Sequence, residues 1–227
     1  MKLLAIDTAT EACSAALSIN GEISERYEIA PRQHATLILP MIDSLLSEAG
    51  ITLAQMDAIA FGRGPGAFTG VRIGVGVVQG LAFSIERPVV PVSSLAAMAY
   101  GAMAKFNATN VLAGIDARMG EVYWGAYQRS SDGGVREVGE ESVCTADEAF
   151  IPETGRWIGV GTAWQSYSEV LAARCDGRLD QAHPAIFPRA SDIAALGVIG
   201  FAAGEGVSAD EAQPLYLRNN VARKRQG

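Results

Sequence analysis

A short apolar run that ends in aspartate occurs twice in this chain, and this internal repeat limits the possible folds more than any other feature. The first copy is Leu3-Leu4-Ala5-Ile6-Asp7, and the second is Val111-Leu112-Ala113-Gly114-Ile115-Asp116. Each copy is long enough for one buried strand. Because the repeat is much longer than the roughly 20 to 50 residues of a solenoid unit, it predicts two similar lobes that face each other across a cleft.

The segments after the first copy alternate between strand and helix patterns. Strands are predicted over residues 12–19 and 23–29, and Asn20-Gly21 between them is typical of a two-residue hairpin turn. Apolar residues at helical spacing predict a helix over 35–49, which Gly50 ends. The remaining predicted elements of this half are a strand over 58–61, a helix over 70–84, a strand over 88–92 and a helix from Ser94.

The second half repeats this order. Its predicted strands cover residues 111–116, 121–128, 135–143 and 157–160, and its predicted helices cover 145–150, 164–174 and 191–203, with a turn at 132–134. This is the duplicated β-β-β-α-β-α arrangement of a two-lobed, actin- and hexokinase-like α/β fold, of the ASKHA and ribonuclease H-like type. We therefore predict an N-terminal lobe over residues 1–104, which carries the partner-binding helices, and a C-terminal lobe over 105–227.

Charge and segment lengths restrict the partners and the compartment. The formal net charge of the 227 residues is -7, which opposes strong independent binding to nucleic acid, because that affinity depends largely on Lys and Arg. The first apolar run is too short for a signal peptide, and no later stretch offers about 18 uncharged apolar residues without helix-breaking residues. We expect a cytoplasmic protein that does not contact a membrane, with Cys13, Cys144 and Cys175 as reduced thiols.

The cleft between the lobes is the candidate site. Asp7 and Asp116 end the two repeated strands and are expected to point into it. The candidate residues for a relic nucleotide-binding site in this cleft are Asp7, Thr8, Thr10, Gly64, Gly66 and Asp116. The alternative is that each aspartate only caps a tight turn, where Asp is common.

A glycine-rich loop over residues 62–70 lies between a predicted strand and a predicted helix. Its backbone amides could converge on an anion at the helix N-terminus. It is not a P-loop, because no lysine occurs between Lys2 and Lys105, and Pro65 and its position in the chain argue against a dinucleotide fingerprint. A purely structural turn that needs glycine is an equally good explanation.

The helices predicted over 35–49 and 70–84 are apolar over more than one face. Such helices are buried on several sides, either inside the monomer or against a partner. We predict an exposed apolar pair that packs on a partner, with Gly74, Gly76 and Gly80 allowing close approach of another helix. The predicted contact residues are Leu37, Ile38, Met41, Leu45, Val71, Val75 and Val78.

The two histidines and the basic residues near the end of the sequence do not indicate a catalytic or metal site. His34 and His183 are far apart in the chain, so they form no metal-binding pair, and neither adjoins a nucleophile motif. We predict no catalytic residues and no metal site. Residues 214–225 are basic and could touch RNA or an acidic partner, although a solvated terminus explains them as well.

Four segments together carry a family resemblance. They are Ile6-Asp7-Thr8-Ala9-Thr10, the run from Gly64 to Gly74, Pro91-Val92-Ser93-Ser94-Leu95, and Leu215-Tyr216-Leu217-Arg218. With these motifs the chain closely resembles the TsaB (YeaZ) family over essentially its whole length. The glycine-rich run that begins at Gly64 is the most specific of the four.

The resemblance implies a role in the bacterial formation of threonylcarbamoyladenosine (t6A) in tRNA. It implies a non-catalytic subunit that binds and supports its paralogue TsaD, the threonylcarbamoyltransferase, in a complex with the P-loop ATPase TsaE. TsaD carries a His-x-x-x-His metal motif, and alignment on the glycine loop places those histidines at Ser94 and Met98 of this chain. The resemblance thus implies that no cofactor is required, while ATP or ADP can be present within the complex.

The resemblance also implies how the subunits meet. The helices predicted over 35–49 and 70–84 are implied to contact TsaD, and the same patch can pair with a second copy in a homodimer. Contact with tRNA is implied only through the complex.

Two other functions stay open on the residues. An ATP-dependent phosphotransferase of the same fold would use Asp7, Thr8 and Thr10 around phosphate and Asp116 near magnesium, and it would bind nucleotide by itself. A peptidase is suggested by the old glycoprotease label of the wider family, but the chain shows no nucleophile-base pair.

Overall fold

The first sheet of the computed structural model, which describes residues 1–218, has five strands in the order β3-β2-β1-β4-β5. Strands β1, β2 and β3 form an antiparallel meander, and β4 and β5 lie parallel to β1. The strands are β1 (Lys2–Asp7), β2 (Ala12–Ile19), β3 (Glu22–Ile29), β4 (Ala58–Gly62) and β5 (Val89–Val92). The predicted turn is confirmed, since Asn20 and Gly21 both have a positive φ, as a tight hairpin requires.

The second sheet has the same strand order. It runs β11-β10-β6-β7-β8, and β9 also pairs with β7. The strands are β6 (Asn110–Arg118), β7 (Glu121–Arg129), β8 (Val135–Glu137), β9 (Ser142–Thr145), β10 (Trp157–Val160) and β11 (Leu179–His183). The duplicated, two-lobed α/β fold is therefore confirmed. The predicted strand over 135–143 is wrong in detail, because the chain leaves the sheet between β8 and β9, and β11 was not predicted.

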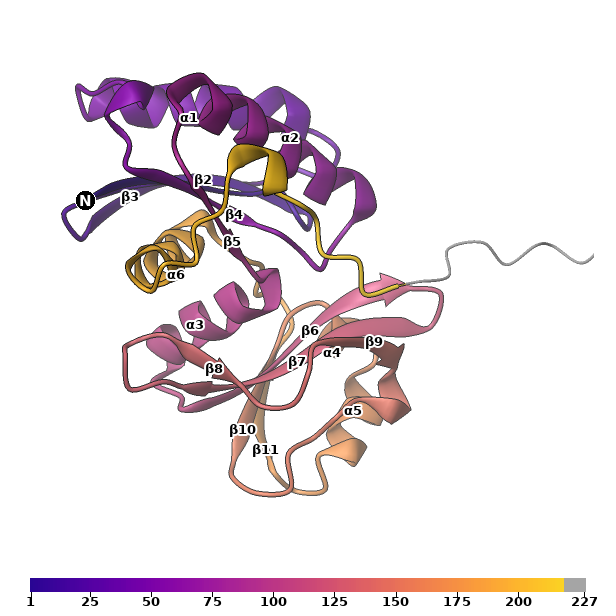
Figure 1. Cartoon of the computed structure of the whole chain (residues 1–227). Helices are drawn as coiled ribbons and strands as arrows, with labels where there is room; N and C mark the ends of the chain where they lie inside the picture. Colours follow the sequence, from indigo (N-terminus) through magenta and orange to yellow (C-terminus); the bar gives the residue numbers. More distant parts are fainter. Residues whose placement is uncertain (219–227) are drawn as a thin grey trace, which may run out of the picture.

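The helices form three layers around the two sheets (Figure 1). Helices α1 and α2 cover the outer face of the first sheet, α4 and α5 cover the outer face of the second, and α3 and α6 lie between the sheets. The helices are α1 (His34–Glu48), α2 (Phe68–Ile85), α3 (Ser94–Phe106), α4 (Ala163–Ser166), α5 (Ser168–Arg174) and α6 (Ala190–Ala202). Short 3-10 turns cover Leu53–Gln55, Ala146–Glu148 and Ala209–Glu211.

Two helix predictions in the second half need correction. The helix predicted over 145–150 is only the 3-10 turn Ala146–Glu148. The helix predicted over 164–174 is broken at Tyr167, whose φ of -133° is not helical. The second lobe therefore keeps the strand order of the first but replaces its long outer helices with shorter ones.

Both faces of each central strand are buried, which explains why these strands read as continuous apolar runs. In β1, Leu4 and Ile6 pack under α1 and α2, while Leu3 and Ala5 pack against α6. In β6, Leu112 packs against α4 and α5, whereas its neighbours on either side pack against α3. The repeated run is thus a pair of equivalent core strands.

Each of the two middle helices packs mainly on one sheet. Helix α6, from the second half of the chain, packs on the first sheet. Helix α3 packs instead on the second sheet, and the two helices also contact each other. Gly197 permits the close fit of α6, because a Cβ at this position would lie 2.5 Å from the Ala60 side chain.

Helix α2 is long and apolar enough to cross a membrane on length and composition alone. Its glycines do not interrupt it, contrary to the expectation that they break this apolar stretch. One face of the helix is nevertheless built into the first lobe, where Val71, Val75, Val78 and Ala82 are buried against the sheet. We therefore describe α2 as a core helix of this lobe.

Candidate functional site

A cleft of about 450 Å³ separates the two lobes, and it contains three of the predicted site residues. Thr10 and Gly66 line it from the first lobe, and Asp116 lines it from the second. Thr162 at the N-cap of α4, and Gln165 and Ser166 within the helix, add polar groups. Sequence reasoning thus found the cleft but did not find these α4 residues, whose positions depend on how the lobes pack.

Asp7 and Thr8 lie behind this cleft rather than in it. Each is only 1% exposed, and a Cβ at Gly62 would collide with the Asp7 carboxylate. Burial raises the pKa of Asp7 to about 6, although hydrogen bonds from the Ala9 N–H and the Ser94 hydroxyl oppose the shift. The Thr8 hydroxyl donates to the Gly70 carbonyl at 2.8 Å. Neither side chain is free to meet a phosphate in this arrangement.

The two repeated aspartates form the same local turn. Oδ1 of Asp7 accepts from the Ala9 N–H at 3.0 Å, and Oδ1 of Asp116 accepts from the Arg118 N–H at 2.8 Å. A carboxylate that accepts from the amide two residues later is an Asx-turn. The structure therefore supports the turn-capping alternative for both positions.

The carboxylate of Asp116 is also engaged by side chains. It accepts from the Ser166 hydroxyl at 3.1 Å and lies 3.4 Å from the Arg118 guanidinium. Arg118 in turn lies 3.6 Å from Glu11, so these charges link the two lobes across the cleft. An incoming magnesium ion would have to displace these partners from Asp116.

The glycine-rich loop packs directly on the backbone that follows Asp7. A Cβ at Gly66 would collide with the Ala9 carbonyl, and a Cβ at Gly70 would collide with the Thr8 carbonyl. The Ala67 N–H donates to the Ala9 carbonyl at 2.7 Å, so this amide is not available to an anion. The glycines thus serve close packing of two loops.

Gly64 does not line the cleft. Its φ is +94°, and a Cβ there would approach Val71 and the Leu215 carbonyl. Of the six predicted nucleotide-site residues, the structure therefore brings Thr10, Gly66 and Asp116 together. It places Asp7, Thr8 and Gly64 elsewhere.

Most of the predicted partner-contact residues belong to the core of the first lobe. Burial is complete or nearly so for Ile38, Leu45, Val71, Val75 and Val78, while Leu37 and Met41 are partly buried. The prediction is corrected for the five buried residues, because they already pack against the sheet beneath them. Periodicity showed that these helices are apolar, but it did not show which face meets the sheet.

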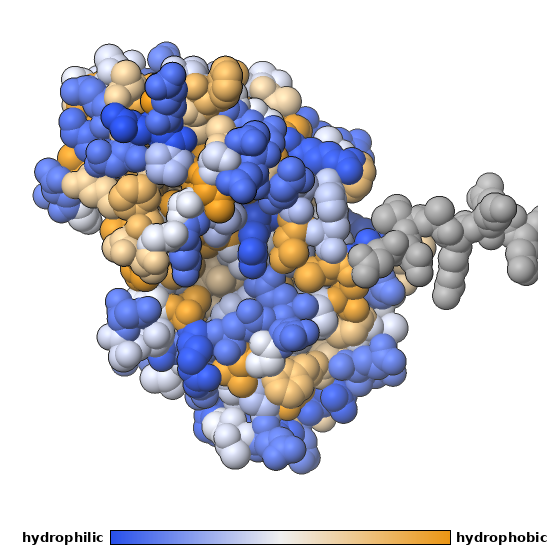
Figure 2. Space-filling view, in the orientation of Figure 1, coloured by the Kyte–Doolittle hydropathy of each residue, from blue (hydrophilic) through white to orange (hydrophobic). Residues whose placement is uncertain are grey.

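A different set of α2 residues faces outwards. Gly76 and Gly80 are exposed, and a Cβ at either position would meet no atom within 4 Å. They share a face with Ile73 and Val77, which are partly buried, and Phe83 near the end of α2 is 80% exposed. Leu39 of α1 is 50% exposed in the same outer layer. Figure 2 shows hydrophobic atoms among hydrophilic ones over this layer at the top of the molecule.

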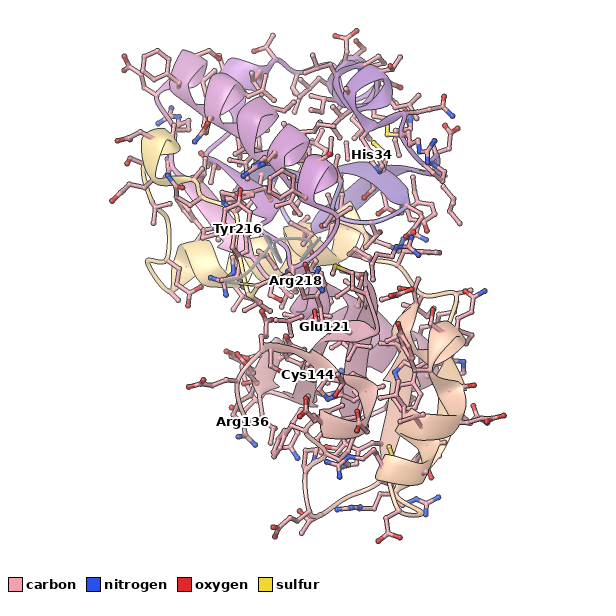
Figure 3. The ribbon with its side chains drawn as sticks, turned by 90° about the vertical axis from the view of Figure 1, so that its right-hand side faces the viewer. His34, Glu121, Arg136, Cys144, Tyr216 and Arg218 are labelled. Atoms are coloured by element: carbon pink, nitrogen blue, oxygen red, sulfur yellow. The ribbon has the colours of Figure 1, made fainter. Side chains whose placement is uncertain are left out.

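Residues 215–218 cross from one lobe to the other beside the cleft, as Figure 3 shows for Tyr216 and Arg218 above Glu121. The Leu215 N–H donates to the Arg63 carbonyl at 2.8 Å, which fixes the segment to the end of β4. Tyr216 accepts a 2.8 Å hydrogen bond from Arg72 of α2. Arg218 then donates to the Ala117 carbonyl and pairs with Glu121 in the second lobe. We call residues 215–218 the crossing segment.

Comparison with known proteins identifies the family. Residues 26–224 match the family model described as TsaD, tRNA N6-adenosine threonylcarbamoyltransferase. The Escherichia coli protein named tRNA threonylcarbamoyladenosine biosynthesis protein TsaB is 45% identical, over 99% of this chain and 98% of its own. The protein of the same name from Haemophilus influenzae is 43% identical, over 99% and 97%. The chain belongs to the TsaB family.

A solved structure supports the same assignment. YeaZ from Pseudomonas aeruginosa superimposes with a TM-score of 0.90 and 49% identity, covering 95% of this chain and 99% of its own. The chain therefore shares its overall two-lobed fold with this solved structure. The match to the TsaD model agrees with the predicted paralogy of the two families.

The resemblance to TsaD places its two metal-binding histidines at positions 94 and 98, where this TsaB family member has serine and methionine. Ser94 is fully buried at the start of α3 and donates to Asp7 at 3.1 Å. Met98, one turn later, is 1% exposed and packs in the core of the second lobe. Within residues 1–218, no group of three or more His, Cys, Asp or Glu side chains is arranged to hold a metal ion.

Proposed function

We propose that this TsaB family member is a cytoplasmic, non-catalytic subunit of the machinery that forms t6A in tRNA. It binds and supports a TsaD-like paralogue, which transfers the threonylcarbamoyl group, in a complex that also contains a TsaE homologue. It reaches tRNA through that complex. It requires no cofactor of its own, and its outer helical layer also allows a homodimer when the paralogue is missing.

The observation that carries this proposal is the open, apolar outer face of α2. Gly76 and Gly80 lie on that face with free space beyond them, flanked by the partly buried Ile73 and Val77. Glycines on a helix surface lower its stability by up to about 1 kcal/mol each relative to alanine, so they need a compensating role. Close approach of a partner helix supplies one.

The buried Asp7 supports a non-catalytic role. Its carboxylate is covered by Gly62 and bonded to Ser94, so it has no access to a substrate in the cleft. Neither a hydroxyl at position 94 nor a thioether at position 98 matches the imidazole ligands of the TsaD motif. These features support a subunit that keeps the fold of the transferase while the paralogue provides the chemistry.

An ATP-dependent phosphotransferase of the same fold is less well supported. Of its four required side chains, Asp7 and Thr8 are buried, and Asp116 is held by Arg118 and Ser166. Calorimetric titration of the purified chain with MgATP or MgADP separates the two functions. The proposal expects no saturable heat from the chain alone, and binding that weakens in Asp116→Asn would favour the phosphotransferase.

A peptidase is also less well supported by the residues. Nε2 of both His34 and His183 is buried without a hydrogen-bond partner among the described residues. The His183 ring stacks on the Phe106 ring with centroids 3.8 Å apart, and among the described residues no hydroxyl or thiol forms a hydrogen bond with its Nε2.

The test of the proposal is light scattering of the chain mixed with its TsaD-like paralogue, comparing wild type with Gly76→Glu. The variant places a charge on the proposed interface without filling any space in the monomer. Its fold should be retained, because glutamate is a better helix former than glycine. We expect the complex to disappear while the melting temperature of the monomer stays the same or rises.

Ala173→Glu is the matched control. Ala173 is exposed on α5, on the outer layer of the other lobe, so this variant adds the same charge away from the proposed surface. It should bind the paralogue like wild type. A Gly76→Glu variant that still forms the complex would remove the proposed surface.

A further inference from the structure

A hollow of about 570 Å³ lies where α3, the start of α6 and the segment before α6 meet. Its volume is within the range of small-molecule sites. Met98 and Ala102 of α3 line it on one side, and Ile186 and Phe187 of the segment before α6 line it on another. Neither the crossing segment nor any predicted nucleotide-site residue lines it, so it is separate from the cleft between the lobes.

Asp192, in the first turn of α6, supplies the acidic group of this hollow. Its carboxylate lies against the backbone of α3, because a Cβ at Gly101 would be 2.3 Å from Oδ2 of Asp192. Arg189, whose charge acts on Asp192, pairs with Glu25 and lies over the Tyr27 ring instead. Among residues 1–218, the partly buried Asp192 forms no ion pair.

Lys105 supplies a positive charge at the edge of the same hollow. Its ammonium group lies 5.3 Å from the centre of the Phe106 ring, and in the described part of the chain it forms no ion pair either. Gly101 and Lys105 are four residues apart on α3, so they share a helix face and lie about 6 Å apart along its axis. The hollow therefore carries an unpaired acid against Gly101 and an unpaired base one helical turn away.

The position of Asp192 lowers the stability of the free protein when the carboxylate is ionised. Burial is the main cause, and it raises the pKa of Asp192 to about 7. Proteins retain such groups mostly where they bind or react with something. A ligand with an ammonium group would give the Asp192 carboxylate the partner that the chain itself does not provide.

We propose that this hollow binds a free α-amino acid with an uncharged side chain, whose ammonium group meets Asp192 and whose carboxylate meets Lys105. Such a ligand carries both charges on one carbon atom, and with a hydrogen bond of about 2.9 Å at each end it spans one helical turn. Its side chain would lie against the apolar groups of Met98, Ala102 and Phe187. The proposal goes beyond the subunit function and does not depend on it.

Calorimetric titration of the full chain with L-alanine, L-valine and L-leucine tests the site. The titration is done at pH 8, so that Asp192 is largely ionised. We expect saturable heat with at least one of the three amino acids. N-acetyl-L-valine lacks the ammonium group and isobutylamine lacks the carboxylate, so each should bind at least about tenfold more weakly than L-valine, the loss expected for one charge-assisted hydrogen bond.

Two variants assign the charges, and a third is their matched control. Asp192→Asn and Lys105→Met should each weaken amino-acid binding at least about tenfold, for the same reason. Both should fold, because Asp192→Asn removes a destabilising charge without adding volume and Lys105 is exposed. Asp43→Asn makes the same chemical change as Asp192→Asn on the exposed face of α1, outside the hollow, and should bind like wild type.

Three results would overturn the site. The first is the absence of saturable heat with all three amino acids, and the second is an affinity for isobutylamine or N-acetyl-L-valine equal to that for L-valine. The third is a folded Asp192→Asn or Lys105→Met variant that binds like wild type. Each result leaves the proposed subunit function standing, because that function is tested by assembly with the paralogue and by Gly76→Glu.

Discussion

The hydroxyl group of Ser94 donates a hydrogen bond of 3.1 Å to Oδ2 of Asp7. This contact joins the first residue of α3 to the last residue of β1, at the position where the family resemblance places a metal-binding histidine in TsaD. The carboxylate is enclosed by Gly62, Ser94 and the Ala9 N–H, with 1% of the residue exposed. In an open cleft this carboxylate could take part in catalysis. In this protein it is enclosed and contributes only to the packing of the interior.

The first prediction concerns the pH dependence that Asp7 gives to folding. Burial raises the pKa of Asp7 from 3.8 to about 6, so the folded state holds the proton more tightly than the unfolded state. The protonated group is neutral in both states below pH 4, and stability is lost as the pH rises through 6. Asp7→Asn should remove this loss, which amounts to about 3 kcal/mol at 1.36 kcal/mol per pKa unit.

Urea unfolding of wild type and Asp7→Asn at pH 4 and pH 8 measures this difference. The variant should gain stability relative to wild type only at the higher pH, because asparagine keeps the acceptor for the Ala9 N–H and never becomes charged. The same gain at both pH values would show that the titration of Asp7 is not its cause.

The second prediction contrasts two glycines of the same helix. A Cβ at Gly70 would collide with the Thr8 carbonyl, whereas a Cβ at Gly76 meets nothing within 4 Å. Gly70→Ala should therefore destabilise the protein by about 1–3 kcal/mol through overpacking. Gly76→Ala should stabilise it by up to about 1 kcal/mol, because alanine is the better helix former. Thermal unfolding of both variants checks the opposite signs, and two changes of the same sign would contradict the packing of α2 on the Asp7 turn.

The third prediction concerns Ser93, which joins the two lobes. Its hydroxyl oxygen caps α3 by accepting from the Leu95 and Ala96 N–H groups, and it also donates to Glu141 of the second lobe, as Tyr127 does. Ser93→Ala should cost about 1–2 kcal/mol for the cap alone, and more because the half-buried Glu141 is left with one partner fewer.

Chemical unfolding checks this value, with Ser84→Ala on α2 as the control. Ser84 is exposed and bonds only to the Leu81 carbonyl within its own helix, so its replacement should change stability by less than about 0.5 kcal/mol. Equal effects of the two substitutions would mean that neither the Ser93 cap nor its contact with Glu141 contributes measurably to stability.

The fourth prediction concerns Asp192 at the junction of α6 and α3. Burial, and then the charge of Glu25, raise its pKa to about 7, while Arg189 opposes the shift. Its ionisation should therefore reduce stability as the pH rises from 4 through 7, and Asp192→Asn should be more stable than wild type at pH 8 but not at pH 4. Melting temperatures at the two pH values decide this, and a variant that is less stable at pH 8 would contradict it.

The core strands and the hairpin turns were predictable because their signals are local. An apolar run as short as residues 3–6 is typical of a buried strand in an α/β protein, and Asn20-Gly21 adopts positive φ angles without help from distant residues. Strand β11 was not predicted because Leu179–His183 is largely polar and partly exposed, so its residues show no strand pattern. It is a strand because it pairs with β10. The break at Tyr167 likewise leaves no clear mark in the periodicity.

The sequence by itself determined the duplicated α/β fold and the family. The reason is that the repeated runs, the glycine loop and the Leu215-Tyr216-Leu217-Arg218 motif each consist of consecutive residues. Only the tertiary structure decided which faces of α1 and α2 are free, that Asp7 is enclosed, and that Tyr216 meets Arg72. The physical reason is that burial and side-chain contact depend on what packs against each surface. Those neighbours, such as Arg72 and Tyr216, can be 144 positions apart in the chain.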